Sequence, residues 1–261
     1  MKPSPIRLGS MLFTLVEPQR GHEVAYNRWY ERDHFYSGVM IGAYSFAGRR
    51  YVATREDKAL RVPGDSPVVP DPMRGSYLAI YWVLAGHHDE WNQWSVEQVN
   101  RLHEHGRMFE KRDHIYTIIA DHDWAHYRDA DPVPAELALD HPYPGLVAVV
   151  GGIEDGASRE DLDAWYREQY LPDALKGSPV ALCLSFTPVP LRGDAPADVP
   201  RSEGRRFVHL YFLEGESTAA WDAHFAGHAA ALAGTGLGRL LWASPFRPTL
   251  PGTDTYTDQL W

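Results

Sequence analysis

The sequence has little of what a secreted or membrane-spanning protein needs. It contains one cysteine, Cys183, in 261 residues, so no disulfide can form within the chain, and this fits a reducing compartment. No apolar run approaches the roughly 18 residues of a membrane span. Residues 1–5 carry no hydrophobic region of the signal-peptide type. We therefore expect a cytoplasmic protein without membrane contact.

Basic charge and nucleotide-binding motifs are also missing. Lys and Arg number 25 against 35 Asp and Glu, which gives a formal net charge of −10 with no basic stripe along the chain. A nucleic-acid partner is therefore not expected. The sequence has no Rossmann fingerprint or phosphate-binding loop, and no Gly-x-Ser-x-Gly elbow of a serine hydrolase. The glycine-rich stretch 234–238 lacks the strand before it and the helix after it that phosphate binding requires.

An internal repeat organises the residues that are present. The pair Trp29-Tyr30 recurs 136 residues later as Trp165-Tyr166. A second match, at an offset of 130 residues, relates Tyr81 and Trp91 in the strand-like run 77–84 and the helix after it to Tyr211 and Trp221. Two matches in the same order at nearly the same offset indicate a duplicated fold.

Each half is predicted to follow the order β-α-β-β-α-β. The expected strands are 10–16, 44–53, 77–84 and 115–120 in the first half, and 146–151, 180–189, 207–213 and 240–243 in the second. Helices are expected near 23–36, 90–109, 158–170 and 218–232. The prediction is an α+β fold of two tandem ferredoxin-like repeats, 1–130 and 145–261 with a C-terminal tail, joined by a proline-rich linker at 131–144.

Two such sheets can bury their open faces against each other, which gives an intrachain dimeric α+β barrel. A fused pseudo-dimer needs no partner to cover its sheets. The chain can nevertheless form a homodimer. The tail after residue 245 is expected to wrap the other half. The long loop 54–76 is expected either to cover a cavity or to be disordered, and the loop 190–205 corresponds to it in the second half.

The first repeat also resembles a known family. Asn27-x-Trp29-Tyr30-x-x-x-His34, followed by Gly48-Arg49-Arg50-Tyr51, resembles the EthD-like branch of the dimeric α+β barrel superfamily. The resemblance implies a small, mostly apolar pocket and a functional acid–histidine pair, here Asp33 and His34. The second half departs from the pattern, because Tyr170 replaces the histidine. The superfamily includes cofactor-free oxygenases, isomerases, decarboxylases, dehydratases and haem-dependent relatives.

His34 is the leading candidate for a general acid or base, because histidine titrates near neutral pH. Asp33 is expected to orient it rather than to react. His122, on the strand end 121–124, can form an acid–base couple with His34 if it points inward. The alternatives are a structural histidine at 34 and a solvated strand end at 122.

Aromatic residues are candidates for the lining of a substrate pocket, where a hydroxyl or indole can bond a developing oxyanion. They are Tyr30, Tyr44, Tyr81, Trp82 and Trp124. Their alternative role is core packing, and Tyr81 and Trp82 alternate along a strand, so only one of them can face a given cavity. His103 and His105 point about 200° apart on a helix and cannot form a same-face metal pair. His114 follows the same helix. We expect no metal site and no cofactor.

The function predicted from the sequence is a cofactor-free enzyme. It would perform acid–base chemistry, as a lyase, dehydratase, isomerase or decarboxylase, on a small and partly apolar carbonyl or aromatic substrate. One alternative is a cofactor-free or haem-assisted monooxygenase. Another is a non-catalytic binding or accessory protein of a degradation pathway.

Overall fold

The computed structural model describes residues 5–197, 199–201 and 204–261. The first half holds four strands and the helices that follow them: β1 Leu8–Pro18, α1 Glu23–Trp29, η1 Tyr30–Met40, β2 Ser45–Val52, α2 Arg55–Ala59, β3 Tyr77–Leu84, α3 His88–Glu104 and β4 Arg112–Tyr127. The second half repeats the order: η2 Ala135–Leu137, β5 Gly145–Ile153, α4 Arg159–Trp165, η3 Tyr166–Tyr170, α5 Leu171–Leu175, β6 Val180–Val189, β7 Arg206–Leu213, α6 Ser217–His224, α7 His228–Ala233 and β8 Gly238–Pro248.

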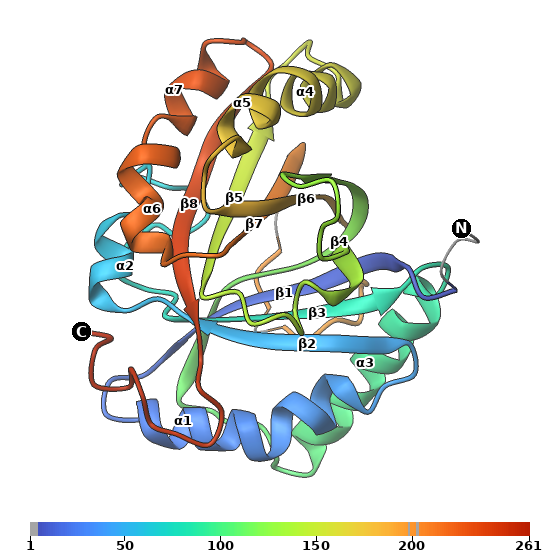
Figure 1. Cartoon of the computed structure of the whole chain (residues 1–261). Helices are drawn as coiled ribbons and strands as arrows, with labels where there is room; N and C mark the ends of the chain where they lie inside the picture. The colour runs from blue at the N-terminus through green and yellow to red at the C-terminus, as the bar shows by residue number, and fades with distance from the viewer. Residues whose placement is uncertain (1–4, 198, 202–203) are drawn as a thin grey trace.

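The eight strands close into one antiparallel barrel in the order β1-β3-β2-β8-β5-β7-β6-β4 (Figure 1). At one junction β4 pairs with β6 over a long register from Ile119↔Val189 to Tyr127↔Leu182. At the other junction β2 and β8 share only the pairs formed by Tyr51 and Val52. The predicted fold of two ferredoxin-like repeats packed as a barrel is confirmed.

Strand alternation divides the apolar residues into a barrel core and two outer clusters. In β4, Ile118 points into the core, whereas Ile119 packs under the helices of the first half. Large side chains fill the barrel interior, among them Trp82, Phe186 and Trp242, which are fully or almost fully buried. The interior is therefore a packed core, and space for a ligand has to lie between the sheet and its helices.

Several element boundaries differ from the sequence prediction. The first helix does not end near residue 36, because α1 continues into the π-helical segment η1 as far as Met40. Helix α3 stops at Glu104 instead of 109, and Gly106 follows with a φ of +64°. The predicted helix 218–232 is two short helices, and β8 is longer than the predicted strand 240–243.

The loop 54–76 packs on the second half. It begins with a capping box in which Thr54 and Asp57 bond each other, and this starts α2. The buried guanidinium of Arg61 donates to the carbonyls of Pro72 and Gly75, and the Ser66 hydroxyl donates to the Leu241 carbonyl of β8 at 2.7 Å. The segment is therefore ordered against β8.

The C-terminal tail crosses in the opposite direction. After β8 it runs beside α1 of the first half (Figure 1). The Asn27 amide donates to the carbonyl of Thr253 at 2.9 Å, and the backbone N–H of Gly252 donates to Glu31 at 2.8 Å. The expected wrapping of the tail around the other half is confirmed, and it holds α1 and η1 from outside.

No helix in the described ranges combines the length and the apolar character needed to cross a bilayer.

Candidate functional site

A cavity of about 120 Å³ lies in the first half, between the outer face of the sheet and the helical elements η1 and α3. Its floor is made by residues of β1 and β4, including Thr14 and Thr117. Its walls include His34 from η1 and Asn92 from α3. The loop after β6 completes the lining with Leu191 and its neighbours, so the second half closes a cavity of the first.

His34 is held in this cavity by ring packing. Its imidazole stacks on the indole of Trp29 with centroids 4.5 Å apart and an angle of 17°, and the ring of Tyr30 meets it edge-on at 5.2 Å. The opposite side lies against Gly38, where a Cβ would come within 2.8 Å of the His34 Nδ1 atom. This Nδ1 is buried and has no hydrogen-bond partner in the described part of the chain.

Charge and burial keep His34 neutral. Burial lowers its pKa from 6.5 to about 3, and the positive charge of Arg112 adds to this effect. The carboxylate of Asp33 acts in the other direction but does not outweigh them. At neutral pH the ring is therefore an uncharged imidazole with one nitrogen able to accept a proton.

A chain of polar contacts crosses the cavity floor. The Oγ1 atoms of Thr14 and Thr117 face each other across β1 and β4 at 2.9 Å. His114 Nδ1 lies 3.2 Å from the Thr117 hydroxyl, and its Nε2 lies 3.2 Å from the Arg112 guanidinium. Arg112 also lies 5.6 Å from the centre of the Trp29 ring. The floor thus joins hydroxyl, imidazole and guanidinium groups around one small space.

Asp33 does not contact this floor. Its carboxylate accepts a hydrogen bond from Ser37 at 2.6 Å and forms an ion pair with Arg107, just beyond α3. Arg107 Nε donates to the same carboxylate at 3.2 Å. These contacts tie η1 to the end of α3, and they leave the position of the His34 ring to Trp29 and Gly38.

The structure does not bring His122 to His34. Residues 118, 120 and 122 of β4 face the barrel interior, where His122 meets the ring of Phe186 at 5.4 Å. His34 lies on the other side of the same sheet. The predicted acid–base couple of His34 and His122 is therefore separated by the sheet itself.

The other members of the predicted 121–124 cluster also diverge. A β-bulge between His122 and Trp124 breaks the alternation, so Trp124 turns outward to pack near His209 of the second half at 5.2 Å. Asp121 lies 3.5 Å from His88, and Asp123 binds Arg159 of α4 at 2.7 Å.

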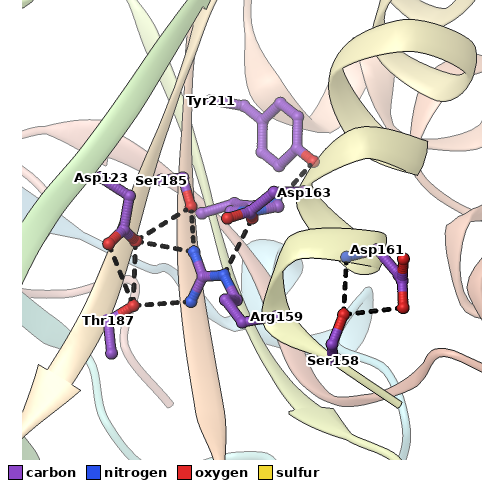
Figure 2. A network of polar contacts seen from close by, with 9 residues as sticks. Asp123, Ser158, Arg159, Asp161, Asp163, Ser185, Thr187 and Tyr211 are labelled. Atoms are coloured by element: carbon purple, nitrogen blue, oxygen red, sulfur yellow. Dashed lines mark hydrogen bonds and ion pairs between the residues drawn. The ribbon is translucent and has the colours of Figure 1, made fainter.

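Figure 2 shows the network that Asp123 joins. Arg159 also donates to Asp163 on its own helix at 2.8 Å, and to the hydroxyls of Ser185 and Thr187 on β6, both at 2.7 Å. The network links β4, β6 and α4, which indicates a structural role at the junction of the two halves.

Of the predicted aromatic lining residues, only Tyr30 borders the cavity. Tyr81 lies directly behind it, since the two phenol oxygens are 2.9 Å apart. Trp82 faces the barrel core, and Trp124, on β4, packs against the apolar cluster of the second half. Tyr44 is partly exposed and stacks on His87 with centroids 3.9 Å apart. Core packing or surface stacking accounts for these three.

In the second half an aromatic cluster surrounds Tyr170. Tyr170, which replaces His34 in the repeat, stacks on Trp165 at 5.1 Å and on His228 at 4.9 Å. The Tyr166 hydroxyl lies 2.9 Å from the Nε2 atom of His228. Tyr166 and His228 are buried, whereas Trp165 and Tyr170 are partly buried.

Sequence reasoning missed several polar residues of the cavity. Thr14, Thr117 and Asn92 were not singled out, and His114 and His103 were noted only as histidines near a helix end. Asn92 could have been found, because it is a polar residue on the helix face that Val96 and Val99 share. The facing threonines come from strands far apart in sequence, and their pairing leaves no local signal.

Within the described residues, no group of three or more His, Cys, Asp or Glu side chains has a metal-binding arrangement.

Known structures resemble the whole chain at low identity. An anthrone oxidase-like protein is 10% identical, with 97% of both chains covered and a TM-score of 0.53. A DypB variant of Rhodococcus jostii RHA1 in complex with haem is 9% identical, with 100% of this chain and 97% of the other covered and a TM-score of 0.52. A mutant chlorite dismutase of Candidatus Nitrospira defluvii is 10% identical over 97% and 95%, with a TM-score of 0.50. No family model matches the sequence, and no curated protein matches it.

These similarities establish the fold, and one of them raises the question of haem. The first-half cavity measures about 120 Å³, well below the roughly 300–1,000 Å³ of pockets that hold drug-sized ligands. A haem is at least drug-sized, so it exceeds the cavity alone. The residues present therefore do not fit a haem in this conformation.

Proposed function

We propose that the first-half cavity is the active site of an enzyme that transfers protons on a small, partly apolar carbonyl or aromatic compound. The observation that carries the proposal is the position of His34. A neutral imidazole is fixed between Trp29 and Gly38, and it borders a small cavity whose floor holds hydroxyl groups and a guanidinium.

The chemistry is set by these groups. His34 accepts a proton from a substrate O–H or C–H bond on its unprotonated nitrogen, and the substrate keeps the electron pair as a phenolate or enolate. The low pKa of His34 makes the free ring a weak base. The negative charge that develops on the substrate raises the proton affinity of the ring again. The positive charge of Arg112 stabilises the anion, and Thr14 or Thr117 can bond it.

The fate of the anion after deprotonation decides the reaction class. Return of the proton to another atom is an isomerisation, and loss of water or carbon dioxide from the anion is a lyase step. A second candidate is a cofactor-free oxygenase, in which the same anion reacts with molecular oxygen. The fold similarity to an anthrone oxidase-like protein over 97% of the chain favours keeping this candidate.

The test is a screen of small phenols, enolisable ketones and β-keto acids with purified protein, in air and without oxygen, followed by mass spectrometry of the products. We expect turnover that His34→Ala and His34→Gln both reduce by about 10²–10⁴-fold, the usual contribution of a general acid or base. His105→Ala is the matched control, because His105 is exposed just after α3.

Turnover without oxygen supports the acid–base enzyme, and turnover only in air supports the oxygenase. Full activity of both His34 variants would overturn the proposal. Saturable ligand binding with no product under either atmosphere would replace it with a non-catalytic binding protein.

A further inference from the structure

A β-bulge in β4 brings His114 to the floor of the cavity. The register with β1 passes from Leu15↔Tyr116 to Val16↔His114, so Ile115 is an extra residue on β4. Ile115 and Tyr116 both pack on the barrel core, and His114 therefore lies on the outer face of the sheet with Thr117. Bulges re-aim side chains in this way beside many active sites.

Thr14 and Thr117 lie directly opposite each other on the face of the sheet that the cavity covers. They are register partners, and the residues before and after them, Phe13 and Ile118, belong to the barrel core. Alternation therefore turns both threonines away from the core. Each keeps a small exposed area, 8% for Thr14 and 6% for Thr117, and both line the cavity.

Arg112 fixes the direction of the hydrogen bonds in this floor. A guanidinium can only donate, so its contact of 3.2 Å with Nε2 of His114 makes that nitrogen the acceptor of a neutral ring. The ring hydrogen then lies on Nδ1, and a protonated ring carries a hydrogen there as well. In both states Nδ1 donates to the hydroxyl oxygen of Thr117, 3.2 Å away.

The threonine pair consequently has one hydrogen that is not used. Two hydroxyl groups carry two hydrogens, and one of these bridges the two oxygens, which lie 2.9 Å apart. His114 cannot accept the other, because its Nδ1 is a donor. Among residues 5–197, 199–201 and 204–261, neither hydroxyl has a further hydrogen-bond partner. An unpaired buried donor is unfavourable, so an acceptor has to come from the occupant of the cavity.

We propose that Thr14 and Thr117 form an oxygen-binding site that donates one hydrogen bond to the carbonyl oxygen of the substrate. A carbonyl oxygen suits this site, because it accepts and brings no hydrogen that needs an acceptor of its own. The cavity measures about 120 Å³, and an apolar cavity of about 150 Å³ holds one benzene molecule. The substrate class is therefore a monocyclic ketone.

His114 and Arg112 are the positioning residues of this site. His114 donates to Thr117 from behind, and the charge of Arg112 lies next to His114, so the hydroxyl hydrogen that meets the substrate is polarised. An enolate oxygen is bound more strongly than a ketone oxygen, because the hydrogen bond to it is charge-assisted. The inference rests on the proposed function for the reaction, whereas binding of the oxygen depends on the two threonines.

The test measures binding to the full chain by isothermal titration calorimetry. Two ligand pairs replace C=O by C=CH₂ at similar volume: cyclohexanone with methylenecyclohexane, and acetophenone with α-methylstyrene. The ratio of the two affinities is compared between proteins, so that the different hydration of the ligands cancels. In the double variant Thr14→Val, Thr117→Val, we expect this ratio to shift by about tenfold towards the hydrocarbon for at least one pair.

The hydrogen count also predicts the single variants. Thr14→Val and Thr117→Val each keep one hydroxyl with its hydrogen, so each should retain most of the wild-type preference. The matched control for the double variant is Thr14→Ser with Thr117→Ser, which keeps both hydroxyls and should keep the wild-type ratio. Circular dichroism checks that every variant folds.

Infrared spectroscopy of bound cyclohexanone gives a second measurement that needs no variant. A hydrogen bond to a carbonyl oxygen lowers the C=O stretching frequency. The band of the ketone bound to the wild type should therefore lie below its position in an apolar solvent. Where the double valine variant folds, the band should return towards the apolar position.

Two results would overturn the inference: an unchanged affinity ratio in a folded double valine variant, or a bound carbonyl band at the apolar position in the wild type. Either result leaves the proposed function standing, because that depends on turnover and His34. Conversely, failure of the His34 test would remove the catalytic role and leave a ketone-binding site that disappears with the two hydroxyls.

Discussion

The backbone of Gly38 lies directly against the imidazole of His34, four residues earlier in the same π-helical segment. A Cβ on Gly38 would lie 2.7 Å from Cε1 of His34 and 2.8 Å from its Nδ1. On the other side the Trp29 ring stacks at 4.5 Å. The imidazole is thus confined from both faces, and π-helical segments of this kind are frequent at functional sites. The absence of a side chain at residue 38 is what makes room for the ring.

Gly38→Ala should therefore disable the site while the protein still folds. The new methyl group displaces the His34 ring, and a misplacement of about 1 Å can cost about 100-fold in rate. Crowding at the methyl group opposes the usual helical gain of about 0.5–1 kcal/mol for Gly→Ala, so the net change in stability should be small. The measurement is kcat/KM beside the free energy of unfolding in urea.

Gly227→Ala provides the control for this change. Gly227 has a right-handed helical conformation at the start of α7, and a Cβ there would meet nothing within 4 Å. Activity of the control should stay at the wild-type level. Wild-type kcat/KM in Gly38→Ala would show that contact with Gly38 does not position His34.

The pH dependence of the site should lack the usual histidine limb. Burial and the charge of Arg112 lower the pKa of His34 to about 3, so the ring stays neutral and able to accept a proton throughout pH 5–8. Titration of the His34 Cε1–H resonance by NMR should show no change near pH 6.5. Arg112→Gln removes one cause of the lowering and should move the midpoint upward. A midpoint near 6.5 in the wild type would contradict this account of the ring.

The repeated fold could be predicted from the sequence because its signals are local. Strand and helix periodicities give the order β-α-β-β-α-β, and the Trp-Tyr pairs at 29–30 and 165–166 mark the same place in each half. In the structure, Tyr30 and Tyr166 are the first residues of the two π-helical segments. The contrast between His34 and Tyr170 also pointed to the first half, where the cavity beside His34 lies.

The positions of the site residues depended on long-range geometry that no local sequence pattern encodes. The bulge at Asp123 changes the direction of every later side chain on β4, and no sequence period marks it. The loop after β6 lines the cavity because it crosses from the second half to the first. The similarity between the loops 54–76 and 190–205 does not reveal this. Residues such as Thr14 and Thr117 form a site only once β1 and β4 are paired.

The buried His228 should make the protein less stable in acid. Burial lowers its pKa from 6.5 to about 4 in the folded state, so between these values the unfolded chain binds more protons. Its contribution to the free energy of unfolding is therefore greatest above pH 6.5 and decreases as the pH falls towards 4, by at most about 3 kcal/mol. His209 shifts in the same direction.

Urea denaturation at pH 7 and pH 4.5 measures this effect. His228→Gln should lose less stability between the two values than the wild type, since glutamine does not titrate and can still bond the Tyr166 hydroxyl. His105→Gln, an exposed histidine, should behave as the wild type. An equal loss in His228→Gln and the wild type would assign the acid sensitivity to other groups.

Arg159 should matter for stability and not for ligand binding. It is about one-fifth exposed and holds Asp123 at the junction of β4, β6 and α4, and burial raises the pKa of that carboxyl (Figure 2). Removing one partner of a desolvated pair leaves an uncompensated charge, so Arg159→Met should lower the free energy of unfolding by about 2–3 kcal/mol. Adding Asp123→Asn should restore part of it, because the stranded charge disappears.

The exposed pair of Arg239 and Glu154 gives the comparison for this effect. Arg239→Met should change stability by less than about 1 kcal/mol, because water already screens that pair. Affinity for ligands of the first-half cavity should stay unchanged in all three variants, since none of the altered residues lines that cavity. If Arg159→Met weakened ligand binding without loss of stability, the two halves would be coupled through the bulge at Asp123. Asp123 and Arg159 would then belong to the functional site.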